Sequence, residues 1–316
     1  MKYSREYLER LAETTDFRTD TLEKVLRLKR LLDQVTRHAY LGPRLVLKGG
    51  TAFNLFYARV PRLSVDLDFN YVGAVEREAM LRERPEIERA VGQIAAAEGY
   101  RVQPGRDEHA GRKLYLGYVN GLGTADRIEV DLNYLFRVPL VPPELRPGWT
   151  PDPDFSCRAR VAGLEEVVAG KLLAFLDRVA TRDLYDLASF AAAPPNYDAA
   201  TLRRLFVGLS GVLPKALTAY SPRHLDNFTQ KALDAELAPM VRTGERPEVE
   251  RLKSRVAPLL SDLLTLSPGE QQYVDRLQWG EFLPELVAGD DPELLDRLRR
   301  HPALRWKVEN ARKRRS

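Results

Sequence analysis

Apolar residues recur at helical spacing near the start of the chain. The apolar stripe consists of Leu22, Val25, Leu26, Leu28, Leu31, Leu32 and Val35. Arginines and lysines separate these positions, so the pattern predicts an amphipathic helical stretch over residues 5–40. Gly42-Pro43 ends that stretch, because neither residue suits a helix interior. The mostly apolar residues 44–48 that follow predict a short strand.

The remaining patterns separate a region of mixed strands and helices from a helical region. Alternating positions predict strands at 62–71, 112–119 and 126–136, and helical spacing predicts helices at 52–57 and 75–98. Residues 139–154 contain six prolines and predict a linker. The later helices are predicted at 163–180, 182–193, 198–209, 222–235, 247–265, 269–286 and 291–300. We therefore expect an α+β fold, with a mixed β-sheet and a helical lead-in in a domain at 1–150 and a mostly helical domain at 151–316.

One predicted strand carries acidic residues on a single face. Side chains alternate between the two faces of a strand, so Ser64, Asp66, Asp68 and Asn70 share a face. Asp66 and Asp68 lie roughly 7 Å apart at their Cα atoms, and both can lean onto one divalent cation. Mg²⁺ (or Mn²⁺) prefers such oxygen ligands. The same alternation is also typical of an edge strand with a polar outer face and no metal.

The last predicted strand of this region repeats the arrangement. Its polar residues at alternate positions are Glu129, Asp131 and Asn133. From a neighbouring strand, Asp131 can complete a three-carboxylate metal set with Asp66 and Asp68, or accept the proton of an attacking hydroxyl. A plain polar strand face is the alternative interpretation of these residues.

A paired glycine lies between a predicted strand and a predicted helix, in Lys48-Gly49-Gly50-Thr51. Glycines let the backbone approach a ligand closely, and the N–H groups at a helix start favour an anion such as a triphosphate. Thr51 precedes Asp66 by 15 residues, which strengthens the link to the acidic strand. The alternative is an ordinary strand-to-helix turn.

A lysine falls on an apolar helix face in the second half of the chain. Lys171 lies four residues from both Val167 and Phe175, within the stripe of the predicted helix 163–180. A lysine that faces inward needs a negative partner, for which a triphosphate is one candidate. The alternative is a lysine at the border of the stripe whose ammonium reaches water.

The next predicted helix carries three charged residues of interest. Arg182 and Asp186 are four residues apart and can pair with each other on one helix face. Asp183 lies near the helix start, where a carboxylate interacts favourably with the helix dipole. Each of these residues therefore has a purely structural interpretation.

Composition narrows the chemistry. Cys157 is the single cysteine, which excludes an intramolecular disulfide and disfavours a thiolate zinc site. There is no apolar run of about 18 residues and no apolar signal core at the N-terminus. We expect a cytoplasmic protein with no membrane partner.

Positive charge is concentrated at the C-terminus. The net charge is +4, but residues 297–316 alone contain nine Lys or Arg and one Glu. Such a basic segment often contacts nucleic acid, and Trp306 between two cations can stack on a base. A solvated chain end is the alternative.

These motifs together resemble the nucleotidyltransferase superfamily that contains DNA polymerase beta, and more closely its AbiEii-type toxins, including the mycobacterial MenT toxins. The segments that carry the resemblance are Lys48-Gly49-Gly50-Thr51-Ala52, Arg62-Leu63-Ser64-Val65-Asp66-Leu67-Asp68, Lys171 and Arg182-Asp183-Leu184-Tyr185-Asp186-Leu187. The resemblance covers roughly residues 40–190. No motif beyond about residue 200 can be matched.

The resemblance implies roles for individual residues. It assigns catalysis to Asp66, Asp68, Asp131, Lys171 and Asp183, with the first three as metal ligands. It assigns nucleotide binding to Lys48, Gly49, Gly50, Thr51, Ser64, Lys171, Arg182 and Asp186. In this scheme Asp183 steers Lys171 or the acceptor.

The resemblance also implies a function. A toxin of this kind transfers a nucleoside monophosphate from an NTP to an acceptor, and the 3′ end of tRNA is the acceptor that we expect, so that translation stops. A separately encoded antitoxin is the expected partner. Two alternatives remain open: transfer to a protein or a small molecule such as an aminoglycoside, and a non-catalytic module that binds nucleotide or RNA.

Overall fold

The computed structural model describes residues 3–108 and 110–314. The chain forms two compact units. Unit 1 consists of Met1–Arg137, Pro143–Ala162 and Pro239–Glu245. Unit 2 consists of Val138–Pro142, Gly163–Ala238 and Arg246–Ser316. The chain therefore passes from one unit to the other several times.

Unit 1 is built around a seven-stranded sheet with the order β3-β4-β5-β2-β1-β7-β6. The strands are β1 (Leu45–Lys48), β2 (Asp66–Tyr71), β3 (Arg101–Glu108), β4 (Gly111–Val119), β5 (Ala125–Asn133), β6 (Glu144–Gly148) and β7 (Cys157–Val161). The pairs β2–β5 and β1–β7 are parallel, and the other neighbouring pairs are antiparallel. This mixed sheet, together with the many helices of the chain, confirms the expected α+β fold.

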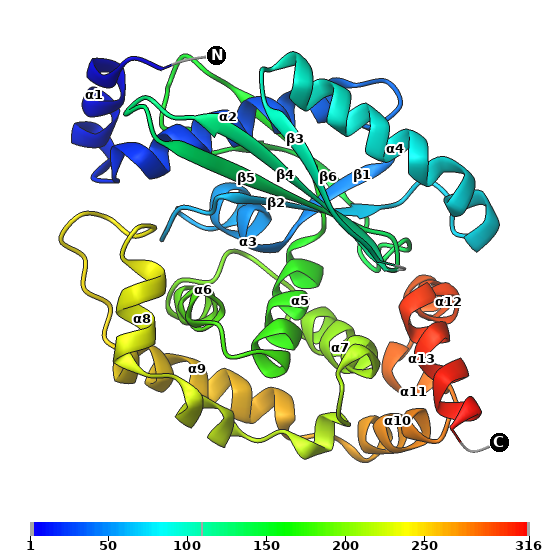
Figure 1. The fold of residues 1–316 in the computed structure, drawn as a ribbon. Coiled ribbons are helices and arrows are strands. Elements are labelled where there is room, and N and C mark those ends of the chain that lie inside the picture. The colour runs from blue at the N-terminus through cyan, green and yellow to red at the C-terminus, as the bar shows by residue number, and fades with distance from the viewer. Residues whose placement is uncertain (1–2, 109, 315–316) are drawn as a thin grey trace. The chain divides into compact units, whose positions relative to one another are not determined.

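Helices cover one face of the sheet in unit 1. α2 (Thr19–Arg37) and α4 (Arg77–Ala97) lie across it, as Figure 1 shows. The apolar residues of β5 point to this face and are fully buried, which explains why their alternation in the sequence was so regular. The acidic residues of β5 therefore point to the opposite face.

The lead-in is two helices and not the single stretch expected over residues 5–40. α1 (Arg5–Thr15) ends at Asp16, whose φ of 59° lies in the left-handed region, and α2 starts at Thr19. An aspartate tolerates this conformation better than most residues. Apolar spacing does not report such a local break, because both helices contribute to one core.

Three strands were not predicted, and one lies in the expected linker. β6 occupies Glu144–Gly148 within 139–154, which corrects the linker prediction. Both β6 and β3 are edge strands, and they contain Pro147 and Pro104. An edge strand tolerates proline because one of its sides needs no backbone N–H donors. The prolines therefore masked these strands in the sequence.

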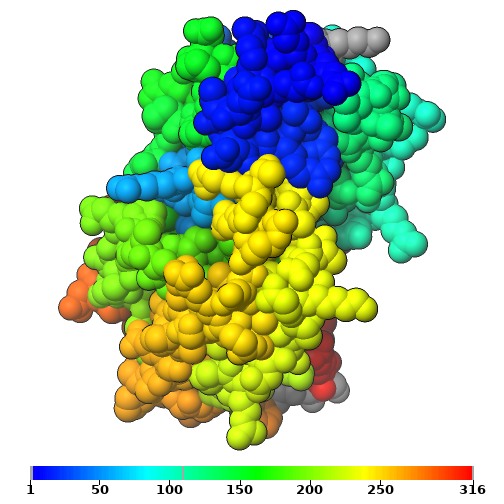
Figure 2. All heavy atoms as spheres, turned by 90° about the vertical axis from the view of Figure 1, so that its left-hand side faces the viewer, coloured from blue at the N-terminus to red at the C-terminus, as the bar shows by residue number. Residues whose placement is uncertain are grey.

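A late segment of the chain completes unit 1. Figure 2 shows the yellow segment around Pro239–Glu245 against the blue surface of α1 and α2. The backbone oxygen of Pro239 accepts from Thr21 Oγ1 at 2.7 Å, and that of Met240 accepts from the backbone N–H of Leu63 at 2.7 Å. The N–H of Thr243 donates to the Asp16 carbonyl at 2.6 Å.

Unit 2 is helical, as expected. Its α-helices are α5 (Leu164–Asp177), α6 (Thr181–Ala192), α7 (Ala199–Leu209), α8 (Gln230–Leu237), α9 (Val249–Leu264), α10 (Pro268–Gln278), α11 (Glu285–Ala288), α12 (Pro292–Arg300) and α13 (Pro302–Lys313). Two predicted helices are each divided. The first begins as a 3-10 turn, Pro222–Asn227, before α8, and the second is α10 followed by α11.

Most of the basic C-terminal segment is helical. α13 buries Ala303, Leu304 and Val308, whereas the side chain of Trp306 is 50% exposed. Arg315 and Ser316 lie outside the described residues. None of the helices in the described part of the chain combines the length and the apolar character that crossing a membrane requires.

Candidate functional site

A row of four charged residues crosses one face of the sheet in unit 1. Lys48 on β1 is the register partner of Asp68 on β2, and Asp68 is the partner of Asp131 on β5. Asp131 is in turn the partner of Lys113 on β4. Paired residues on neighbouring strands point to the same face. Two carboxylates therefore lie side by side between two lysines.

A second row crosses β2, β5 and β4 two residues away from the first. Asp66 is the register partner of Glu129, and Glu129 is the partner of Tyr115. Because β2 begins at Asp66, strand alternation places Asp66 and Asp68 on one face but does not extend to Ser64. Ser64 is 5% exposed in the irregular segment before the strand.

Burial and like charge act on the central carboxylates. Burial raises the pKa of Asp131, Lys48 lowers it in part, and the neighbouring charge of Asp68 raises it further. Burial also opposes the charge of Lys113, but its bond to Glu129 and the charge of Asp131 outweigh that effect and raise its pKa. Burial and the charge of Asp68 thus outweigh the two lysines in their effect on the pKa of Asp131.

The glycine turn fits against this row. Gly49 begins α3 (Gly49–Ala52) with a φ of 71°, a backbone region that favours glycine. A Cβ atom at Gly49 would overlap the carboxylate of Asp68. Thr51 is fully buried, and its hydroxyl donates to the backbone oxygen of Asp66 at 2.5 Å. The turn therefore positions both aspartates of β2.

The oxygen donors of these carboxylates are the type that a hard divalent cation prefers. Asp66, Asp68 and Asp131 supply oxygen donors from adjacent strands, half-buried and close to lysines, which suits Mg²⁺ bound together with phosphates. Among residues 3–108 and 110–314, no three His, Cys, Asp or Glu side chains are already gathered tightly enough to enclose a metal ion. The aspartates are neighbours whose side chains would have to turn toward a shared ion.

The residues singled out in the second half of the chain form a separate cluster within unit 2. Lys171 Nζ lies 2.5 Å from Asp186 Oδ2 and 3.2 Å from Asp183 Oδ1. Arg178 Nε also contacts Asp183, at 2.9 Å. Both aspartates are 1% exposed at their side chains, so Lys171 offsets buried negative charge. Arg182 lies on the same helix, α6.

Sequence reasoning missed the residues that flank the carboxylates on β4 and β5. Lys113 Nζ lies 3.3 Å from Glu129, and Arg127 Nη2 lies 2.9 Å from the other oxygen of Glu129. The guanidinium of Arg127 stacks over the ring of Tyr115, with its Cζ 4.8 Å from the centroid. The alternation of residues 112–119 contained this signal, because positions 113, 115 and 117 share the polar face.

The comparisons decide the family. The model of the family described as nucleotidyl transferase AbiEii toxin, type IV toxin–antitoxin system, matches residues 30–310. This chain belongs to the AbiEii family. The match confirms the resemblance seen in the motifs and extends it well beyond residue 190. It makes the protein a nucleotidyltransferase toxin of a type IV toxin–antitoxin system, and so a nucleotidyl-transfer enzyme.

Two solved structures share the AbiEii-type fold of this chain. The nucleotidyltransferase toxin MenT4 from Mycobacterium tuberculosis has a TM-score of 0.67 and 21% identity, over 94% of this chain and 98% of that one. JHP933 from Helicobacter pylori has a TM-score of 0.50 and 16% identity, over 83% of this chain and 99% of that one. Among curated protein sequences, none matches.

Proposed function

We propose that the protein transfers a nucleoside monophosphate from an NTP to the 3′ end of tRNA, with Mg²⁺ or Mn²⁺ as cofactor. The observation that supports this proposal best is the register of β2 and β5, which makes Asp68 and Asp131 neighbours on one face. Extra nucleotides on tRNA would block its aminoacylation and hence translation. A separately encoded antitoxin would restrain this activity.

In the proposed reaction, the 3′-hydroxyl oxygen of the acceptor forms a bond to the α-phosphorus of the NTP. The bond from that phosphorus to the bridging oxygen of pyrophosphate breaks. Asp131 accepts the hydroxyl proton, a role open to a carboxylate that lies beside the attacking hydroxyl. Asp66, Asp68 and Asp131 would hold the metal, which would supply charge stabilisation for the attacking and leaving oxygens.

The glycine turn would receive the phosphates of the NTP. Gly49 lets the backbone pass close to the Asp68 carboxylate, and Lys48, the register partner of Asp68, adds a positive charge. Thr51 and Ser64 are buried and support the turn and the start of β2. We propose a positioning role for Thr51, because its hydroxyl donates to the Asp66 carbonyl.

An RNA acceptor is favoured by the surface next to the carboxylates. Tyr115, Lys113 and Arg127 lie on the same sheet face as Asp131, and the side chain of Arg127 is 62% exposed. Arg101 and Gln103 extend this face on β3. Cations interleaved with an aromatic ring suit the phosphates and bases of a single-stranded nucleic acid end.

The lysine cluster of unit 2 has a narrower proposed role. Asp183 and Asp186 hold Lys171 in a fixed position, and Arg178 shares the charge of Asp183. We propose that the cluster first stabilises the α5–α6 pair. A phosphate contact by Lys171, and nucleotide contacts by Arg182 and Asp186, are the additional roles that the family resemblance suggests.

A transfer assay tests the proposed function. Purified protein is incubated with total RNA, Mg²⁺ and each of the four NTPs labelled at the α-phosphate, and the labelled RNA is then sized and sequenced. The Asp68→Asn variant should lose labelling, whereas Asp296→Asn, at a side chain 61% exposed on α12, should retain it. If no NTP labels any RNA, the RNA-acceptor proposal fails. Label on protein or on an aminoglycoside would support the alternative acceptors.

A further inference from the structure

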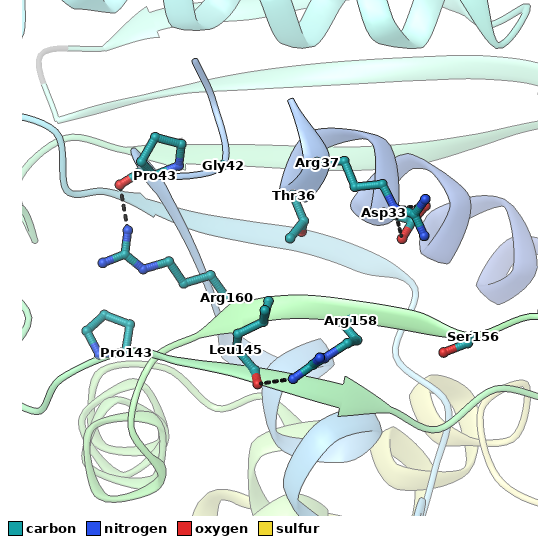
Figure 3. Close-up of a pocket in the computed structure, with 10 residues that line it drawn as sticks. All are labelled: Asp33, Thr36, Arg37, Gly42, Pro43, Pro143, Leu145, Ser156, Arg158 and Arg160. Atoms are coloured by element: carbon teal, nitrogen blue, oxygen red, sulfur yellow. Dashed lines mark hydrogen bonds and ion pairs between the residues drawn. The ribbon is translucent and has the colours of Figure 1, made fainter. Parts of the chain in front are cut away.

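A cavity in unit 1 is lined by three arginines. Figure 3 shows Arg158 and Arg160 reaching into it from β7, with Arg37 from the last turn of α2. Its volume is about 550 Å³, within the range of sites that hold a small organic ligand. Neither the sequence patterns nor the resemblance assigned these residues a role.

Each arginine is held in place by a single anchor. Arg160 Nη1 donates to the Pro43 carbonyl at 2.6 Å, and Arg158 Nη2 donates to the Leu145 carbonyl at 3.3 Å. Arg37 Nε bonds to Asp33 at 3.1 Å. A guanidinium carries five N–H donors, so these anchors orient the groups and leave most of their donors for a ligand.

The charge of the cavity is not balanced by its own carboxylates. Asp33 is the one acidic residue in the lining, and it pairs with Arg37. Neither Arg158 nor Arg160 has a carboxylate partner among the described residues. The carbonyl end of α2 offsets part of this charge, but a helix end supplies only about half a charge. These two guanidinium groups, which have no carboxylate partner among the described residues, therefore favour an anion.

The rest of the lining is apolar or uncharged. Pro43 and Pro143 form flat walls, and Leu145 is 52% exposed. The hydroxyls of Thr36 and Ser156 also line the cavity. Fork-shaped donors beside apolar walls match a phosphate attached to a sugar and base better than they match a bare inorganic ion.

The cavity is separate from the carboxylate row. Pro43 lies in the turn before β1, whereas Lys48 ends that strand, and the three Cα steps of β1 span roughly 10 Å. β7 runs parallel to β1, with Val161 beside Leu47, so Arg158 and Arg160 lie toward the start of β1. None of the four residues of the carboxylate row lines this cavity.

We propose that this cavity is a second nucleotide-phosphate site, which binds a phosphate group together with its adjoining nucleoside through Arg158, Arg160 and Arg37. Such a group can belong to the backbone of an RNA strand or to a free nucleotide. The binding does not depend on nucleotidyl transfer, so it can be measured with the carboxylate site deprived of metal.

Two binding titrations in EDTA test the proposal. Fluorescence anisotropy follows a labelled 12-nucleotide single-stranded RNA, and calorimetry follows AMP. The double variant Arg158→Ala/Arg160→Ala should lower the affinity for one of these ligands by about tenfold or more. If RNA is the ligand, the slope of log K against log salt should fall by about 1.4, because each single-strand phosphate contact contributes about 0.7.

Matched controls separate the cavity from general charge. Arg5→Ala/Arg10→Ala removes the same charge from exposed positions of α1 and should leave both ligands unchanged. Arg158→Lys/Arg160→Lys keeps the charge but loses the bidentate guanidinium geometry. The salt dependence of RNA binding should stay the same, while the affinity should fall severalfold. This variant also serves if the alanine pair does not fold.

The outcomes distinguish the two sources of phosphate. Weaker RNA binding with no AMP binding identifies an RNA backbone contact, and lost AMP binding with RNA unchanged identifies a free-nucleotide site. If the double variant binds both ligands like the wild-type protein, or if the α1 pair has the same effect, the proposed site is overturned. None of these results depends on whether the protein transfers nucleotides.

Discussion

Asp68 on β2 and Asp131 on β5 are register partners on adjacent parallel strands, and burial together with the charge of Asp68 raises the pKa of Asp131. Two carboxylates in this relationship repel each other unless a cation lies between them. In the proposed function, a divalent cation bound by both carboxylates would relieve this repulsion.

The first prediction follows from this repulsion. Asp131→Asn should raise the urea midpoint of the metal-free protein, because the substitution removes one of two neighbouring charges, while nucleotide transfer should fall on the order of a thousandfold. Urea unfolding in EDTA and the labelled transfer assay measure the two effects. An Asp131→Asn protein that is less stable than wild type would show that the carboxylate is a structural element.

Gly49 offers a second prediction. In Gly49→Ala, the new Cβ would overlap the carboxylate of Asp68 in a left-handed backbone region, so stability should fall by about 1–3 kcal/mol. Transfer should fall as Asp68 is displaced. Gly92→Ala is the control, since a Cβ there meets Val102 at an ordinary 4.0 Å within helix α4, and it should be neutral or stabilising.

The buried cluster of unit 2 gives a third prediction. Lys171→Met removes the cation between Asp183 and Asp186, and should cost about 3–5 kcal/mol in the free energy of unfolding. Lys253→Met, which breaks a pair with the exposed Glu250, should cost less than about 1 kcal/mol. Chemical unfolding monitored by circular dichroism compares them. Equal losses would contradict the structural role given to Lys171.

Lys29 predicts a pH dependence. It is fully buried, donates to the Trp149 carbonyl, and has no carboxylate partner among the described residues; burial lowers its pKa from 10.5 to about 8. Between pH 8 and 10.5 the unfolded state binds more protons at this site, so stability should rise with pH. The contribution is about 3 kcal/mol at most.

Lys29→Met isolates this contribution. The difference in unfolding free energy between Lys29→Met and wild type should shrink as pH rises from 8 to 10.5, because only the wild-type protein carries the buried charge at the lower pH. Urea titrations at several pH values measure it. A pH-independent difference would show that Lys29 keeps an ordinary pKa in the fold.

The sheet face beside the carboxylates gives a fifth prediction. Tyr115→Ala should raise the KM for the RNA acceptor by about tenfold, since the loss of one base–ring stack costs about 1–3 kcal/mol. The KM for NTP should stay unchanged. Tyr40→Ala, at a tyrosine paired with Arg44 outside this face, is the matched control. Equal effects of the two substitutions would remove Tyr115 from acceptor binding.

The local parts of the site followed from the sequence, but their surroundings did not. Period-two alternation made Asp66, Asp68 and Asp131 recognisable, because one face of each strand is fully apolar. Lys113 and Tyr115 were overlooked because a single polar lysine or tyrosine on a strand carries no motif. Only the register with β5 shows that they flank Asp131 and Glu129.

The long-range features could not be obtained from local patterns. Pro104 and Pro147 suppressed the strand signal on β3 and β6, although edge strands accommodate both residues. The partners of Lys171 lie 12 and 15 residues away on the following helix, and a helix-face argument identifies only the need for a negative group. A phosphate was one candidate for that negative group. In the structure, the carboxylates of Asp183 and Asp186 supply it.

The return of Pro239–Glu245 to unit 1 affects the order in which the nascent protein can mature. The backbone N–H of Leu63, just before the acidic strand, donates to the Met240 carbonyl, and the hydroxyl of Thr21 donates to the Pro239 carbonyl. A ribosome has already produced helices α5 to α8 by the time it adds these residues. The hydrogen bonds that complete unit 1 can therefore form only late in translation, although all of its strands are synthesised much earlier.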